Sequence, residues 1–228
     1  MQYTRYFPLT AFFATLILLS CKNDPPATIP EAPSGPEPVQ VKPVPTEGAV
    51  TYAITEGTVY WAGKKSLGAM HSGTINVESG ALLVNQGQLL SGNVVLDMQS
   101  IAVSDLQDAG EKRDLESHLK DKDFFEVKKF PKAEFKFTEV LPSTHPAFNA
   151  VIAGELIMKG KSNPINIPVK LRIEGDDLVA ESTTFPINRT QWGVNFRSGV
   201  LGTVKDKLIE DVVPLSLKLK AKKAAWGK

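Results

Sequence analysis

The chain has little that would support disulfide, metal or nucleic-acid chemistry. Its 228 residues contain one cysteine, which excludes an internal disulfide and a cysteine-based zinc site. The three histidines, at positions 71, 118 and 145, are too scattered to form a local metal motif. Twenty-six basic residues face 25 acidic ones, so the net charge is +1, without the basic excess of nucleic-acid binders. We therefore expect no metal, no cofactor and no nucleic-acid partner.

Local motifs of common catalytic sites are also missing. There is no Gly-x-Ser-x-Gly nucleophile turn and no His-Glu-x-x-His helix. The run Gly160-Lys161-Ser162 resembles the end of a phosphate-binding loop, but Gly154 lies one residue too far upstream and the surrounding pattern is strand-turn-strand. We therefore expect a turn at Gly160 and predict no catalytic residue.

The first 20 residues have the pattern of a bacterial export signal. Arg5 precedes an apolar run over residues 12–19, which is shorter than the about 20 residues that span a bilayer. Leu18-Leu19-Ser20-Cys21 resembles the lipobox of bacterial lipoproteins, whose cysteine is acylated and becomes the mature N-terminus. Lipidation at Cys21 would anchor the chain to a membrane, and Lys22 favours the outer membrane because inner-membrane lipoproteins usually carry Asp there. An ordinary secretory signal and an uncleaved apolar tail stay open as alternatives.

The next segment, residues 21–48, is predicted to be the acylated cysteine and a linker. Eight prolines fall within residues 25–45, and no apolar periodicity occurs there. Proline-rich chain extends by about 3.1 Å per residue, so the linker would hold a domain up to about 65 Å from the lipid surface. The predicted organisation is a signal peptide over residues 1–20, this linker, and one domain over residues 49–228. The predicted location is the bacterial cell envelope.

From Val50 onward, apolar and polar residues alternate, which is typical of strands with one buried face. Gly, Pro, Asn and Asp separate most of these runs, as in antiparallel sandwiches and barrels. Leu115 and Leu119 lie four positions apart among charged residues and predict one short helix over residues 108–119. Lysines near the end of the chain are expected on the exposed face of the last strand. The clearest alternating runs are residues 50–54, 94–98, 152–158, 165–173 and 213–221.

A distinctive run joins the predicted helix to the strand that follows it. It contains His118-Leu119, then Asp123-Phe124-Phe125, then Phe130-Pro131, then Phe135. This succession resembles the hallmark of the YceI-like family of lipocalin-like polyisoprenoid-binding proteins. The resemblance covers residues 50–221, and Ile157 and Asn188 replace the family's usual Thr and Asp. Further matching segments are residues 92–101, 154–160 and 188–194.

The resemblance implies an all-β fold, an extended eight-stranded antiparallel lipocalin-like barrel with one short inserted helix. It also implies a protein that is not an enzyme and that binds, carries or sequesters an isoprenoid lipid or similar amphiphile of quinone or polyprenyl type. Family members often pair, so a homodimer is an expectation. A long lipid tail needs a tunnel of inward strand residues and a few polar groups at its mouth. The predicted lining is Met98, Ile101, Phe124, Phe125, Phe130, Phe135, Phe137, Leu156, Met158, Trp192 and Phe196, with His71 and Arg189 near the head group.

Two other interpretations stay open at the level of sequence. An enzyme or enzyme accessory acting on a quinone or lipid would assemble its site across strands from His71, Asp97 and Arg189. A barrel whose interior is filled by side chains would have a structural or interaction role. Each predicted lining residue also has an ordinary alternative as core packing, because small barrels fill their interiors with the same residue types.

Overall fold

The computed structural model describes residues 47–199, 202 and 207–225, and its strands form a closed barrel within these residues. The predicted signal peptide, Cys21 and nearly all of the linker lie outside the described residues. Pro43–Lys228 forms one compact unit. In chain order the elements are β1 (Val50–Lys64), β2 (Met70–Asn85), β3 (Gln88–Val103), α1 (Ala109–Lys120), β4 (Lys132–Pro142), β5 (Ala150–Met158), β6 (Lys161–Glu174), β7 (Asp177–Ser182), β8 (Phe185–Asn188), the 3-10 helix η1 (Arg189–Trp192) and β9 (Val212–Lys223).

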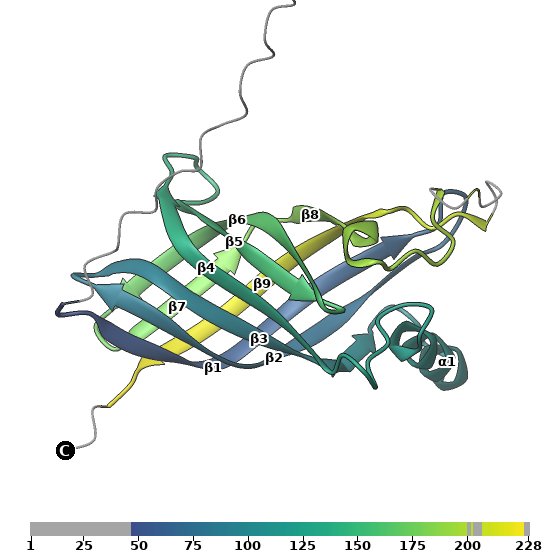
Figure 1. Cartoon of the computed structure of the whole chain (residues 1–228), viewed down its shortest axis with the longest axis horizontal. Coiled ribbons are helices and arrows are strands. Elements are labelled where there is room, and N and C mark those ends of the chain that lie inside the picture. Colours follow the sequence, from purple (N-terminus) through teal and green to yellow (C-terminus); the bar gives the residue numbers. More distant parts are fainter. Residues whose placement is uncertain (1–46, 200–201, 203–206, 226–228) are drawn as a thin grey trace, which may run out of the picture. The chain divides into compact units, whose positions relative to one another are not determined.

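Every strand pairing in the barrel is antiparallel, and the order is β1-β2-β3-β4-β5-β6-β7-β9-β8 with β1 also paired to β9 (Figure 1). β7 pairs with the second half of β9 and β8 with its first half, so these two short strands share one position. The barrel therefore has eight positions, as predicted. β2 and β3 are 16 residues long, so each extends for about 50 Å.

Alternation along the last strand explains why this sequence closes the barrel. Leu219 and Ala221 are buried in the interior, whereas Lys218, Lys220 and Lys222 are exposed. Lys220 pairs with Glu56 of β1 at 2.9 Å on the outer surface. The prediction that these lysines form a solvated face is confirmed. Ion pairs of this exposed kind contribute little to stability, so burial of the apolar face supplies the driving force.

A β-bulge changes which residues of β1 face the interior. The pairing of β1 with β9 shifts between Ile54 and Glu56. Tyr52 is buried before this point, and Val59 is buried after it, so the inward positions change from even to odd numbers. Trp61 and Gly63 therefore face the interior, and Tyr60 is exposed.

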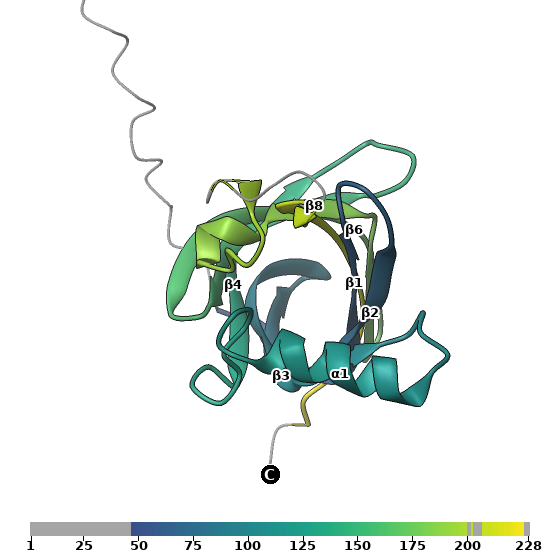
Figure 2. The same cartoon turned by 90° about the vertical axis from the view of Figure 1, so that its right-hand side faces the viewer.

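The predicted helix is confirmed as α1, which lies at one end of the barrel next to β3 (Figures 1 and 2). The Asp108 carboxylate begins the helix, because it accepts hydrogen bonds from the backbone N–H groups of Gly110 and Glu111 at 2.8 and 2.9 Å. Glu116 then accepts a hydrogen bond from the Val103 N–H at 2.9 Å and ties the helix to the end of β3. Within the described ranges, no helix has the length and apolar character needed to cross a bilayer.

Candidate functional site

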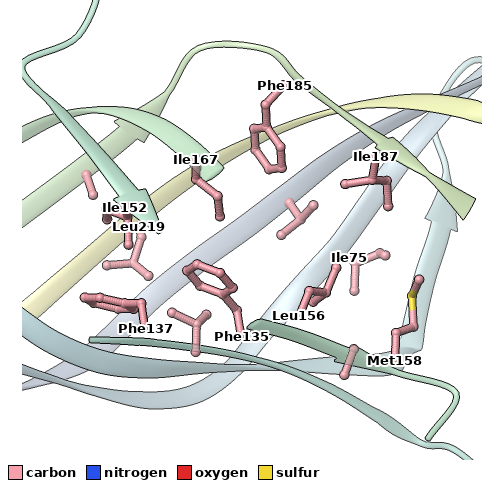
Figure 3. Close-up of a cluster of buried hydrophobic side chains, with 14 of the residues drawn as sticks. Ile75, Phe135, Phe137, Ile152, Leu156, Met158, Ile167, Phe185, Ile187 and Leu219 are labelled. Carbon is pink, nitrogen blue, oxygen red and sulfur yellow. The ribbon is translucent and has the colours of Figure 1, made fainter. Parts of the chain in front are cut away.

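The barrel encloses an inner cavity of about 120 Å³ that is lined almost wholly by apolar side chains. Figure 3 shows Ile75, Leu156, Met158 and Ile187, from three different strands, pointing into the barrel interior. Arg189 is the one charged residue of the lining. A dry cavity of about 150 Å³ is enough to bind benzene, so this space accommodates a short hydrocarbon segment.

A smaller far cavity, of about 30 Å³, follows the inner cavity along the strands. On β4, Ala133 lines the inner cavity, and Phe135 and Phe137 line the far one. On β9, Leu215 lines the inner cavity and Leu217 the far one. The rings of Phe135 and Phe137 stack with their centroids 5.8 Å apart (Figure 3). The empty space is thus elongated along the barrel, and this aromatic pair narrows its far half.

At the other end, the inner cavity meets a mouth pocket of about 260 Å³. Apart from Arg189, the polar and cationic lining is found at the mouth: Lys64, Lys65, His71, His118 and Arg197 line the mouth and not the two inner spaces. The site therefore changes from cationic at the mouth to apolar inside. Residues that line both the mouth pocket and the inner cavity form the neck, namely Trp61, Gly63, Leu119, Phe124 and Ile209.

Three rings pack together on the wall of the mouth. His118 of α1 meets Phe124 and Phe196 edge-on, with centroid distances of 4.9 and 4.8 Å. The rings of Phe124 and Phe196 are 5.1 Å apart. Phe124 is placed by the turn after α1, where the Phe125 N–H donates to the Leu119 carbonyl. The run of residues that carried the family resemblance thus builds one wall of the mouth.

The structure brings most of the predicted lining residues together. Met98, Ile101, Phe124, Phe125, Leu156 and Met158 line the inner cavity. Arg189, predicted near the head group, lines this inner cavity and not the mouth. Phe196 and His71 line the mouth, and Phe135 and Phe137 line the far cavity.

Two predicted lining residues lie elsewhere. Trp192 is fully buried in η1, and its indole N–H donates to the Leu156 carbonyl at 2.8 Å. Phe130 packs against the turn at Gly160, whose φ of +71° favours glycine. Neither residue lines any of the three cavities.

Sequence reasoning missed many residues of the inner-cavity lining, among them those of the first and last strands. Alternation was the signal that could have found these residues, although the bulge in β1 hides it there. The inner-cavity residues missed are Val59, Trp61, Gly63, Ile75, Leu96, Leu119, Ala133, Ile187, Val194, Ile209, Val213 and Leu215.

The neck contains an unsatisfied hydrogen-bond donor. Trp61 Nε1 is buried without a hydrogen-bond partner in the part of the chain that the structure describes. The indole lies over Gly73 of β2, where an added Cβ would come within 2.5 Å of the Trp61 ring. Only glycine allows this close approach, so the ring position is fixed by the strand opposite. A buried N–H without a partner costs free energy, and an oxygen atom brought by a ligand would offset that cost.

Arg189 lines the inner cavity and joins η1 to the segment before β9. Its side chain is 5% exposed, and Nη2 contacts Asp211 at 3.0 Å. Its Nε, Nη1 and Nη2 atoms donate to the backbone carbonyls of Glu210, Val194 and Ile209, respectively. Burial lowers the pKa of Arg189 from its usual value, and the Asp211 carboxylate partly offsets this effect. Arginine nonetheless stays charged at neutral pH.

His71 is paired with a carboxylate at the rim of the mouth. Its Nδ1 lies 2.9 Å from Asp105 Oδ2, and the Ser72 N–H donates to Asp105 Oδ1 at 2.8 Å. Although desolvation opposes ionisation, these hydrogen bonds lower the pKa of Asp105 below its usual value. Asp97 caps the Gln99 N–H on β3 instead.

The residues considered for an enzyme site are not joined to one another. Among the described residues, no hydrogen bond or ion pair connects any two of His71, Asp97 and Arg189. The described ranges also contain no group of three or more His, Cys, Asp or Glu side chains able to hold a metal ion. The arrangement is suited to enclosing an apolar chain.

A sequence model described as the YceI-like domain matches residues 52–221. The chain belongs to the YceI-like family. This match accounts for the whole barrel, from the first buried residue of β1 to the last buried residue of β9, and it confirms the family predicted from the aromatic run.

Solved structures confirm the fold of this YceI-like protein. Burkholderia cenocepacia BcnA is 21% identical, with a TM-score of 0.57 over 73% of this chain and 96% of that one. A polyisoprenoid binding domain from Saccharophagus degradans, implicated in plant cell wall breakdown, is 11% identical, with a TM-score of 0.52 over 77% of this chain and 99% of that one. A comparison with curated proteins gives no match.

Proposed function

We propose that the barrel is a non-catalytic carrier of an isoprenoid lipid, with the tail in the inner cavity and the polar head at the mouth. The observation that carries this proposal is the change from cationic lining at the mouth to apolar lining inside. Membership of the YceI-like family and the polyisoprenoid binding domain of similar fold support the isoprenoid class of ligand. Burial of apolar surface, at about 25 cal/mol per Å², favours taking up the tail.

The order of the cavities gives the ligand a direction. The head lies beside Lys65 and Arg197, and the tail passes the neck between Trp61 and Gly63. A short tail ends in the inner cavity. A longer tail requires the Phe135 and Phe137 rings to move, because only about 30 Å³ is empty beside them.

Membrane attachment belongs to the same proposal. The Leu18-Leu19-Ser20-Cys21 run and the eight prolines of residues 25–45 support an acylated, tethered carrier in the envelope, with the outer membrane favoured. A tether raises the effective concentration of the barrel near its lipid source without new contacts. The acyl anchor and the homodimer stay predictions.

The first test is mass spectrometry of organic extracts from residues 43–228 purified without detergent from a bacterial periplasm. We expect one isoprenoid molecule per barrel, and its mass identifies the head group. If the barrel is empty and also fails to take up ubiquinone or a polyprenol added afterwards, the proposal is wrong, and a structural role for the barrel is favoured.

A second prediction concerns the unpaired donor of Trp61. Trp61→Phe keeps an aromatic ring in the neck and removes the N–H, so binding of a quinone should weaken by about fivefold, the effect of one neutral hydrogen bond. Binding of squalene, a hydrocarbon without oxygen, should not change. The unliganded variant should be about as stable as the wild type, because removal of the unpaired donor offsets the packing lost with the smaller ring. Fluorescence titration with both ligands and thermal unfolding measure these effects; an equal loss for squalene would contradict a hydrogen bond to the ligand.

A further inference from the structure

Exposed apolar side chains gather at the mouth end of the barrel. Among the described residues, the large hydrophobic side chains most exposed to solvent are Leu67 and Met70, at 59% and 61%. Tyr60 and Val212 are 42% and 53% exposed, and both lie on the parts of β1 and β9 nearest this end. Leu141, at 46%, is the exception, because it is near the opposite end of β4.

Leu67 lies in the turn between β1 and β2, and Met70 is the first residue of β2; we call residues 64–70 the β1–β2 tip. Figure 1 shows this turn at the same end of the barrel as α1. The Lys65 N–H donates to the Ala69 carbonyl at 3.1 Å, and the Ser66 N–H donates to the Leu208 carbonyl at 3.0 Å. The backbone of the tip is therefore held by hydrogen bonds while its apolar side chains point into solvent. Exposed apolar groups collected in one place indicate an interaction surface.

The charges around the tip indicate which partner fits. Lys64 and Lys65 belong to the tip, and together with Arg197 they line the mouth. Glu210 forms an ion pair with Lys64 at 3.4 Å. The Asp105 carboxylate is paired with His71. No ion pair within the described ranges neutralises Lys65 or Arg197, whose guanidinium lies over the Phe196 ring. Apolar side chains flanked by cations suit an anionic lipid surface.

Building on the proposed function, we propose that the β1–β2 tip docks the mouth of the barrel onto an anionic lipid bilayer. Leu67 and Met70 insert among the acyl chains, and Lys64, Lys65 and Arg197 contact lipid phosphates. The tip borders the mouth pocket, so a docked barrel opens toward the bilayer. An isoprenoid tail then moves between bilayer and cavity without exposing its apolar surface to water. Such exposure is the unfavourable step when a lipid transfers through solution.

The test uses residues 43–228, a unit with its own complete core and no acyl anchor. Flotation with vesicles of equal parts phosphatidylcholine and phosphatidylglycerol measures binding of the barrel to the surface. Leu67→Asp with Met70→Asp should lower the partition coefficient by about tenfold or more. Lys64→Gln and Lys65→Gln should each lower the partition coefficient by about fivefold. These two effects should be smaller at high salt, because salt screens the attraction between lysine and lipid phosphate. Leu141→Asp is the matched control and should bind as the wild type does.

Lipid transfer connects the surface to the cavity. The Leu67 and Met70 double variant should take up a long-chain polyprenol from these vesicles at least tenfold more slowly than the wild type. Its equilibrium affinity for farnesol in solution should be unchanged, because neither residue lines the neck or the inner cavity.

Two results would overturn the docking proposal. One is vesicle binding by the wild type that is no stronger than binding by the double variant, and the other is an equal loss in Leu141→Asp. Failure of the proposed function has a different signature, since the wild type would then bind neither farnesol nor polyprenol while its vesicle binding stayed measurable.

Discussion

Gly63→Phe is expected to abolish lipid uptake while the barrel stays folded. Gly63 faces the interior after the bulge in β1 and lines both the mouth pocket and the inner cavity. An added Cβ at this position would meet no atom within 4 Å, and the φ angle is not positive. A Cβ therefore fits at this position without strain, and a phenyl ring attached to it would occupy the neck that the two spaces share.

The expected loss of affinity is about a hundredfold or more for any isoprenoid, equivalent to about 3 kcal/mol. Stability should be equal or higher, because a glycine inside a strand costs about 0.5–1 kcal/mol relative to a residue with a side chain. Farnesol titration and thermal unfolding of residues 43–228 measure both effects. Ala62→Phe places the same ring one residue away on the outer face and should leave binding intact. Normal binding by Gly63→Phe would mean that the ligand does not pass this neck.

The regular part of the fold could be predicted because alternation reports burial directly. Leu219 and Ala221 face inward and their lysine neighbours face outward, as the sequence pattern of the last strand indicated. The spacing of Leu115 and Leu119 among charged residues likewise located α1 to within one residue at each end. These features depend only on contacts between neighbours in sequence and on one buried face.

The neck could not be predicted, because the period of β1 is interrupted. Extending the alternation of Tyr52 and Ile54 points Tyr60 inward, but one extra residue at the bulge turns Trp61 and Gly63 inward instead. A bulge depends on the pairing with β9, far away in sequence, and alternation alone carries no signal for it.

Aromatic residue type was also an incomplete guide to the lining. Trp192 is as apolar as Trp61, yet its N–H reaches the Leu156 carbonyl and its ring is enclosed in the core. Trp61 Nε1 has no acceptor among the residues that the structure describes, and the ring lines the neck. Whether a tryptophan belongs to the core or to the site thus depends on whether a backbone carbonyl lies within reach of its N–H. The position of that carbonyl is set only when strands and turns have assembled.

Arg189→Met is expected to destabilise the barrel strongly and to leave the ligand affinity of the folded protein nearly unchanged. The substitution removes the donor to the carbonyls of Glu210, Val194 and Ile209 and leaves the Asp211 carboxylate without its cation. Removing one partner of a buried pair costs about 3–5 kcal/mol, and the lower end of this range, about 3 kcal/mol, applies here because the Asp211 side chain is 23% exposed. For a domain of this size that loss corresponds to a fall of about 10 °C in Tm.

The same variant separates two roles for this arginine. Arg172→Met is the matched control, because Arg172 is exposed on β6 and its loss should change stability by no more than about 0.5 kcal/mol. If Arg189 binds the lipid head group, as the sequence suggested, Arg189→Met should instead keep its Tm and lose affinity for a prenyl phosphate. The structure favours loss of stability, because the guanidinium already uses Nε, Nη1 and Nη2 to join η1 to the segment before β9. A head group that accepted hydrogen bonds from these donors would have to replace the contacts that hold the cavity wall together.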